Sequence, residues 1–147
     1  MRGFLAFALL AVSFLAPASA LAGSGKAIVP YWVASPQHNT AINISNITDN
    51  TLNVSITFYD LNGAQVPNSS VIYSNMLGGN TQIGPKKTAG VALTGFSAIS
   101  NGFAVITWSN SGTGNDVVGL TAHAFRHYSD ASRASESSIP VNNGMPF

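Results

Sequence analysis

Two histidines four residues apart, His123 and His127 in the segment HAFRH, are the side chains that come nearest to a metal site. On a helix this spacing would put both imidazoles on one side, where they could share an ion. The flanking residues alternate as in a strand, where four residues at about 3.3 Å each separate the rings by about 13 Å. One ion with ligand bonds of about 2 Å cannot bridge that distance. We therefore expect surface histidines, since a metal site would need a local helix and a further ligand from His38 or Asp130.

The other residues that could do chemistry form no catalytic set. Asp49, Asp60 and Asp116 fall in expected turns, where a carboxylate accepts hydrogen bonds from backbone N–H groups. Glycoside hydrolysis needs two carboxylates about 5–10 Å apart across a cleft, and no pair is indicated. The segment GFSAIS lacks the second glycine of a G-x-S-x-G elbow, and the chain has no cysteine for thiol or zinc chemistry. We predict that the chain is not an enzyme and binds no cofactor.

The N-terminus has the build of a secretory signal peptide. Arg2 is followed by an apolar run over residues 3–16, then by Pro17 and small residues with A-x-A sites ending at Ala20 and Ala22. The run is shorter than the roughly 20 residues that span a bilayer. We predict that residues 1–22 are cleaved and that the mature chain, without a membrane span, is secreted to the cell surface, the extracellular space or the periplasm.

Charge is scarce in the expected mature chain. Residues 23–147 contain five basic and five acidic side chains, so their formal charge is zero. Nucleic acid and anionic membrane both require a net basic face and are excluded as partners. Charged residues make up 7% of the sequence, against about 25% in typical soluble domains. Such a surface does little to keep copies of the chain apart, which favours self-association.

Short apolar–polar alternations, separated by Gly, Asn, Pro and Ser, fill the chain after residue 25, and no long helix-periodic segment occurs. Strands are expected over residues 26–35, 40–47, 51–59, 64–66, 71–76, 102–109 and 117–128. Within residues 84–96 a turn at Pro85 is followed by a further strand through Val91 and Leu93. This number and spacing predict an all-β antiparallel sandwich over residues 23–128. Residues 129–147 form a polar C-terminal segment, either irregular or containing a last edge strand.

Three details of the pairing can be predicted. A tight turn at residues 48–50 would join the second and third strands as a hairpin, with Ile44 opposite Val54. Asn62-Gly63 is a strong signal for a two-residue turn. Residues 102–109 are apolar almost throughout, as in a strand covered on both faces.

The order of four segments, TAINISNITDNTLNVSITFYDLNG, GPKKTAGVAL, GFAVITWSN and VVGLTAHAFR, resembles the Ig-like and fibronectin-III-like domains of bacterial secreted and surface proteins. In those domains an N-x-S/T turn precedes a V-x-V-x-F-Y-D-x-x-G strand and turn. The middle turn here, Gly84-Pro85, puts glycine ahead of proline, which departs from the pattern. The resemblance covers most of residues 28–126. It implies a single Ig-like β-sandwich of about 7–8 strands that serves as a spacer, adhesion module or assembly subunit.

Polar side chains on the outward side of the second and third strands are the first binding candidates. They are Asn43, Ser45, Asn53, Ser55, Thr57 and Tyr59. Together they would make a flat, uncharged face suited to sugar hydroxyls or to another subunit, or else an ordinary solvated surface. Asn43, Asn46, Asn53 and Asn68 also begin N-x-S/T sequons, which are glycan acceptors in a eukaryotic secretory route and plain polar residues in a bacterium.

The apolar N-terminal strand is the second candidate. Its residues Ile28, Val29, Tyr31 and Trp32 either belong to the chain's own first strand or complete the sheet of the next subunit. Residues 139–147 could be donated in the same way. Head-to-tail donation builds an open filament, because a heterologous contact need not close.

We therefore predict a secreted, non-catalytic structural or interaction protein, a subunit of the cell surface or of an extracellular, filament-forming assembly. Its partner would be another copy or another surface protein. The alternative is a carbohydrate-binding module that uses the polar sheet face with Tyr59 or Trp108.

Overall fold

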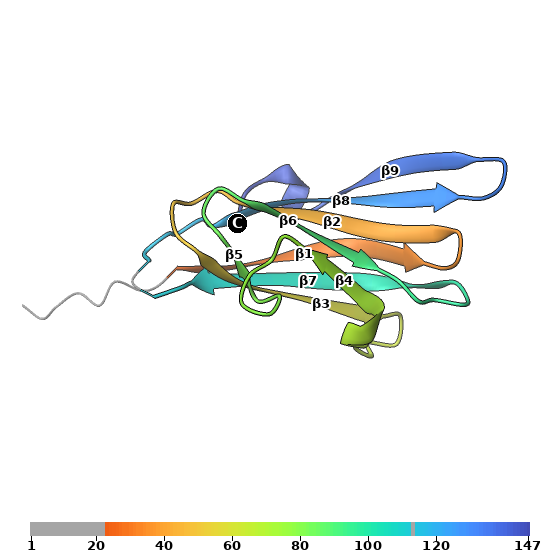
Figure 1. Ribbon diagram of the computed structural model, residues 1–147, viewed down its shortest axis with the longest axis horizontal. Coiled ribbons are helices and arrows are strands. Elements are labelled where there is room, and N and C mark those ends of the chain that lie inside the picture. Colours follow the sequence, from red (N-terminus) through yellow and green to blue (C-terminus); the bar gives the residue numbers. More distant parts are fainter. Residues whose placement is uncertain (1–22, 113) are drawn as a thin grey trace, which may run out of the picture.

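A computed structural model describes residues 23–112 and 114–147, which form two antiparallel β-sheets packed face to face (Figure 1). The strands are β1 (Ser24–Ala34), β2 (His38–Asn46), β3 (Leu52–Asp60), β4 (Val71–Ser74), β5 (Gln82–Ile83), β6 (Thr88–Leu93), β7 (Ser100–Asn110), β8 (Leu120–Ser129) and β9 (Ala134–Pro140). Two 3₁₀ turns, η1 (Asn68–Ser70) and η2 (Asn142–Gly144), complete the described elements. The predicted all-β sandwich is confirmed, with nine strands in place of seven or eight. The predicted signal peptide lies outside the described residues.

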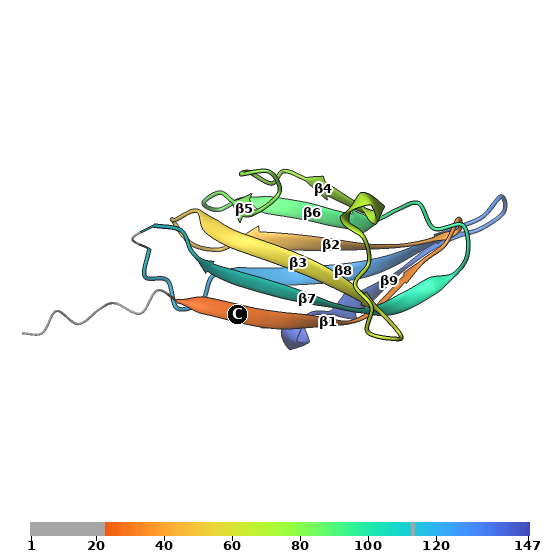
Figure 2. The same cartoon turned by 90° about the horizontal axis from the view of Figure 1, so that it is seen from below.

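One sheet has the order β1-β7-β3-β5 and the other the order β4-β6-β2-β8-β9. Figure 2 shows β1, β7 and β3 side by side in one layer. The polar C-terminal segment does contain an edge strand, because β9 pairs with β8. The β8–β9 hairpin projects beyond the rest of the sandwich (Figure 1). No helix in the described part of the chain is long and apolar enough to cross a membrane.

The predicted hairpin between β2 and β3 is wrong. β2 pairs with β6 and β8, whereas β3 pairs with β7 and β5, so residues 47–51 cross from one sheet to the other. Ile44 and Val54 are both buried as expected, because each strand faces the core from its own sheet. Alternation predicts which face of a strand is buried, and that prediction holds whichever strand lies beside it.

The first strand, β1, has a different neighbour from the first strand of an Ig constant-type domain. In Ig constant-type domains the sheets contain strands ABED and CFG, which puts the first strand beside the second. Here β1 pairs with β7 and shares a sheet with β3. The two-sheet sandwich is thus established, and the Ig-like assignment stays a prediction.

β7 is covered on one face, and the prediction that it is buried on both is wrong. Ala104, Ile106 and Trp108 point into the core, while Phe103 and Val105 alternate with them on the outer side. The apolar residues of β7 that do not reach the core therefore belong to the surface of the four-stranded sheet.

A turn forms at Asn62-Gly63, but the predicted two-residue loop is wrong: the Asp60 N–H donates to the Ala64 carbonyl at 2.9 Å, so the loop has three residues, Leu61, Asn62 and Gly63. Gly63 has a φ of +81°, which favours glycine, and the Asp60 carboxylate accepts hydrogen bonds from the N–H groups of Asn62 and Ala64, each at 2.8 Å. The strand expected after it shrinks to a single bridge between Tyr59 and Gln65.

Candidate functional site

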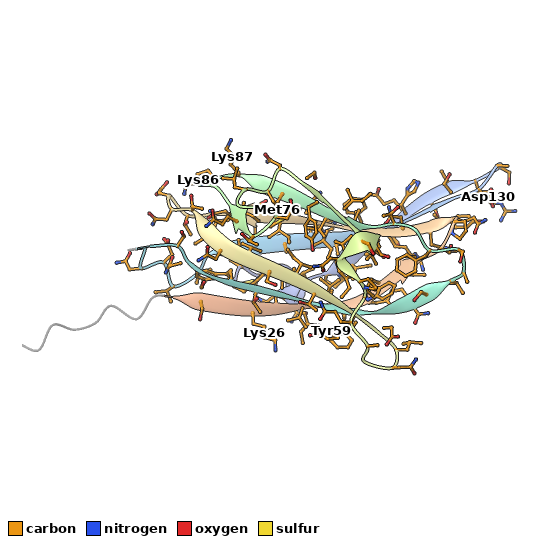
Figure 3. The ribbon with its side chains drawn as sticks, turned by 60° about the horizontal axis from the view of Figure 1, so that its bottom comes forward. Lys26, Tyr59, Met76, Lys86, Lys87 and Asp130 are labelled. Atoms are coloured by element: carbon orange, nitrogen blue, oxygen red, sulfur yellow. The ribbon has the colours of Figure 1, made fainter. Side chains whose placement is uncertain are left out.

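The outer face of the four-stranded sheet, the face turned away from the other sheet, changes from aromatic to polar along its strands. Strand register arranges its side chains in rows across β1, β7 and β3: Tyr31, Phe103 and Tyr59, then Ile28, Val105 and Thr57, then Lys26, Thr107 and Ser55, then Ser24, Ser109 and Asn53. We call the five apolar and aromatic residues of the first two rows the aromatic patch: Ile28, Tyr31, Tyr59, Phe103 and Val105. Figure 3 shows Lys26 and Tyr59 on the same side of the sandwich.

The patch is densest where Tyr59 and Phe103 face each other as a register pair. Their rings stack with centroids 5.1 Å apart and an angle of 17° between the planes. Offset stacking of this kind is a favourable arrangement of aromatic side chains. Among the described residues of these four rows, Lys26 carries the charge, so the face is close to neutral.

A β-bulge in β1 brings Tyr31 to this face. The register with β7 shifts between Val29 and Trp32, so that Pro30 and Tyr31 both lie opposite Phe103 and both are exposed. A bulge inserts one extra residue into a strand and so changes the direction of the side chains around it. Tyr31 thereby joins the row of Phe103 and Tyr59.

Trp32 supports the patch from inside the sandwich. Its indole Nε1–H donates hydrogen bonds to the backbone carbonyls of Tyr59, at 2.9 Å, and of Phe103, at 3.0 Å. These are the two residues whose rings stack on the outer side. Gly102 allows the backbone of β7 to lie close to the Tyr59 carbonyl of β3, because a Cβ at this position would lie 1.9 Å from the carbonyl oxygen. Buried groups thus hold the backbone beneath the exposed rings in place, as a preorganised surface requires.

The predicted binding residues are distributed over three places. The outer face of the four-stranded sheet carries Ile28, Tyr31, Asn53, Ser55, Thr57 and Tyr59. Val29 and Trp32 are buried in the core, and Asn43 and Ser45 lie on the outer face of the five-stranded sheet. The single polar row expected from β2 and β3 does not form, because these strands belong to different sheets. Trp108 is 3% exposed, so the expectation that it presents a ring to a sugar is wrong.

β7 supplies the two patch residues that the sequence did not single out, Phe103 and Val105. The signal was present in the strict alternation of Phe103, Val105 and Thr107 with smaller or buried neighbours. It was obscured because Phe103 and Val105 are as apolar as the core-facing residues between and beside them.

His123 and His127 lie on a strand, both on the outer face of the five-stranded sheet and with Phe125 between them. In residues 23–112 and 114–147, no three His, Asp or Glu side chains come together as metal ligands do. The His123 ring lies beside Phe125, with centroids 6.2 Å apart. His127 instead lines a pocket of about 320 Å³ at the end of the sandwich, together with His38.

A scan against protein-family models finds no match to this chain, and neither do searches of the curated proteins and of the solved structures.

Proposed function

We propose that this chain is a secreted, non-catalytic interaction subunit that associates with further copies of itself through the aromatic patch. The patch is the observation that carries the proposal. It is contiguous across three strands, held from beneath by Trp32 and almost free of charge. Contiguous apolar surface on a soluble domain marks an interaction site, in contrast to single exposed apolar residues. An assembly at the cell surface or outside the cell fits the signal peptide predicted for residues 1–22.

The proposal does not require strand exchange. β1 makes nine register pairs with β7 of its own chain, and its residues Val29 and Trp32 fill the core. Donating β1 to a neighbour would open that core. The free edge of β1 also carries Pro30, a bulge and Lys26, which are the devices that keep edge strands from pairing. Contact through the sheet face is therefore favoured over contact through the edge.

Two isoleucines on edge strands allow a matched test. Ile28 lies in the patch and is 52% exposed, while Ile72 on β4 is 54% exposed on the other sheet. The molar mass of the secreted chain would be measured by light scattering over a range of concentrations. We expect the molar mass to rise with concentration in the wild type and in Ile72→Lys, and to stay at the value of a monomer in Ile28→Lys. A monomeric wild type, or an equal loss in both variants, would overturn the proposal.

A second candidate function, glycan binding, is favoured by the stacked rings of Tyr59 and Phe103. Flat aromatic surface flanked by hydroxyls, here those of Thr57 and Ser55, suits the apolar face and polar edge of a sugar. A glycan that binds the folded chain must raise its melting temperature. We expect that rise to be lost in Tyr59→Ala if the patch binds sugar, and the chain to stay monomeric throughout.

A further inference from the structure

The pocket lined by His38 and His127, which we call the end pocket, lies where β6 ends short of the first residues of β2. The last register pair between these strands is Ala41 with Ala92, and the chain then turns at Gly95, whose φ is +79°. The residues at the start of β2, including Asn39, therefore have no β6 neighbour. The notch left beside them is the pocket of about 320 Å³, a volume at the lower end of the range for small-molecule sites, which begins at about 300 Å³.

The pocket lining is apolar on one part and polar on the other. Phe96 supplies an aromatic wall, and its ring is fixed by Trp32, with centroids 5.8 Å apart. Imidazole, amide and hydroxyl groups line the remainder, from His38, Asn39 and His127 among others. None of the described lining residues is a Lys, Arg, Asp or Glu. Such a lining suits a small neutral ligand with one apolar face and several hydroxyl groups.

The local hydrogen bonds determine which nitrogen of His38 carries its proton. The Ser35 hydroxyl oxygen accepts the backbone N–H groups of Gln37, at 3.1 Å, and of His38, at 3.0 Å. Its own proton is then left to donate to Nδ1 of His38, 3.0 Å away. Neutral His38 is therefore protonated on Nε2, which is a donor for a ligand hydroxyl.

Asn39, which also lines the pocket, carries a polar atom that is unpaired in the described part of the chain. Its Oδ1 is buried and has no hydrogen-bond partner among the described residues. Buried polar atoms in folded proteins are nearly always paired, so an unpaired acceptor beside a pocket needs an explanation. Asn39 lines the pocket, and the terminal torsion of an asparagine is broad, so the amide can turn toward a bound ligand.

From these contacts we infer that the end pocket binds a single neutral sugar ring, the terminal residue of an extracellular glycan. The apolar face of the ring packs on Phe96, and its hydroxyls exchange hydrogen bonds with His38, Asn39 and His127. The pocket lies at the loops of the sandwich and not on the aromatic patch, so this inference does not depend on the proposed self-association.

An NMR titration tests the inference directly. Neutral monosaccharides (glucose, galactose, mannose, N-acetylglucosamine and N-acetylgalactosamine) would be added to the isotope-labelled chain, secreted with its own N-terminal segment, up to about 10 mM, which detects even millimolar affinity. We expect one of them to give saturable shifts of one-to-one stoichiometry, confined to residues 34–39, 93–96 and 127–129.

Matched variants separate the pocket from the rest of β8. His123 and His127 lie on the same face of the same strand, but of these two His127 lines the pocket. Asn39→Ala and His127→Ala should each weaken binding about tenfold, as the loss of a ligand hydrogen bond does, while His123→Ala leaves it unchanged. The inference is overturned if no sugar of the panel saturates, if the shifts map to the aromatic patch, or if His123→Ala weakens binding as much as His127→Ala. The oligomeric state is measured separately, so either proposal can fail alone.

Discussion

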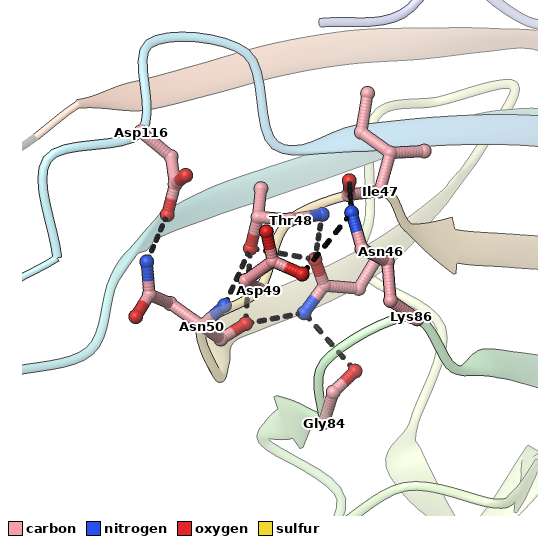
Figure 4. A network of polar contacts seen from close by, with 8 residues as sticks. All are labelled: Asn46, Ile47, Thr48, Asp49, Asn50, Gly84, Lys86 and Asp116. Atoms are coloured by element: carbon pink, nitrogen blue, oxygen red, sulfur yellow. Dashed lines mark hydrogen bonds and ion pairs between the residues drawn. The ribbon is translucent and has the colours of Figure 1, made fainter.

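Asparagine stands at both ends of β2, and the two side chains are used in different ways. Asn46 is 2% exposed, and its amide nitrogen donates to the carbonyls of Asn50, Ile83 and Gly84 at 2.7, 3.0 and 3.0 Å. Its Oδ1 accepts both the backbone N–H and the hydroxyl of Thr48, at 2.8 and 2.9 Å (Figure 4). At the other end, the buried Oδ1 of Asn39 has no partner among the described residues. The Asn46 side chain is thus fully engaged by the fold, whereas the Oδ1 of Asn39 is not paired within the described part of it.

The Asn46 network closes its end of the sandwich. It ties the crossing between the sheets, residues 47–51, to the segment that precedes β6, and Asn50 continues it to Asp116 at 3.0 Å (Figure 4). The network also determines whether one of the four sequons, the one that begins at Asn46, can be glycosylated in the folded chain. Because the amide nitrogen of Asn46 is bonded to three carbonyls inside the protein, Asn46 is not accessible as a glycan acceptor in the folded chain.

The largest expected effect is the loss of stability when the hydrogen bonds of the Asn46 side chain are removed. Asn46→Ala removes all five hydrogen bonds of this buried side chain. The Asn50 and Gly84 carbonyls keep the Thr48 hydroxyl and the Lys87 N–H as donors. A hydrogen bond contributes about 0.5–1.5 kcal/mol net, so with five lost we expect the free energy of unfolding to fall by about 3 kcal/mol or more. Urea unfolding followed by tryptophan fluorescence measures it.

Asn39→Ala is the control at the opposite end of the same strand. It deletes an acceptor that lacks a partner, so the free energy of unfolding should change by less than about 1 kcal/mol. If Asn39→Ala were as destabilising as Asn46→Ala, Asn39 would be a structural residue too, and the contrast between the two ends would be lost.

The two tryptophans repeat the contrast inside the core. Trp32 and Trp108 are both buried, but Nε1 of Trp32 donates to two carbonyls while Nε1 of Trp108 has no partner in the described part of the chain. Replacement by Phe removes the same atoms from each. We expect Trp32→Phe to lower the free energy of unfolding by about 1–3 kcal/mol more than Trp108→Phe does.

The same urea experiment compares the two variants, and the Phe103 and Tyr59 amide resonances report on the patch above Trp32. They should shift in Trp32→Phe and stay in place in Trp108→Phe. Equal loss of stability in both variants would mean that the indole hydrogen bonds of Trp32 contribute nothing beyond packing.

The sequence predicts features of this fold that depend on neighbouring residues, but not those that depend on which distant strands pair. Alternation within β3 correctly predicts that Val54, Ile56 and Phe58 are buried, because it needs no knowledge of the neighbouring strand. The partner of β2 could not be read from residues 48–50, since a short turn and a crossing between sheets look alike in composition. Only the packing of both sheets decides between them.

The candidate sites divide along the same line. Ile28, Tyr31 and Tyr59 could be named in advance, because the first two lie in a strongly apolar segment and alternation places Tyr59 on the outward side of its strand. The end pocket could not be foreseen, because it brings Asn39 beside His127, its register partner from 88 residues along the chain. It also depends on where β6 ends, which no pattern near Asn39 records.

The smallest predicted effect is that of low pH, which should affect the tip of the β8–β9 hairpin and leave the Asn46 network in place. At the tip of the β8–β9 hairpin, the Asp130 carboxylate accepts hydrogen bonds from the Tyr128 hydroxyl, from the Ser132 N–H and hydroxyl, and from the Arg133 N–H. The Tyr128 hydrogen bond, followed by those of Ser132 and Arg133, lowers the pKa of Asp130 from 3.8 to about 2. Figure 3 shows Asp130 at the far tip of the molecule.

A carboxylate whose pKa is lower in the folded chain stabilises the fold above its usual pKa and stops doing so as the pH falls through the folded value. The hairpin tip should therefore keep its hydrogen bonds at pH 4 and lose them between about pH 3 and 1, with a midpoint of about 2. Amide shifts of Ser132 and Arg133 measured against pH report this step, and Asp130→Asn should abolish it. The Asn46 side chain has no titrating group, so its own hydrogen bonds to Thr48 should outlast those of the tip. A midpoint near 3.8 would instead mean that the carboxylate is solvated and that the turn does not depend on its charge.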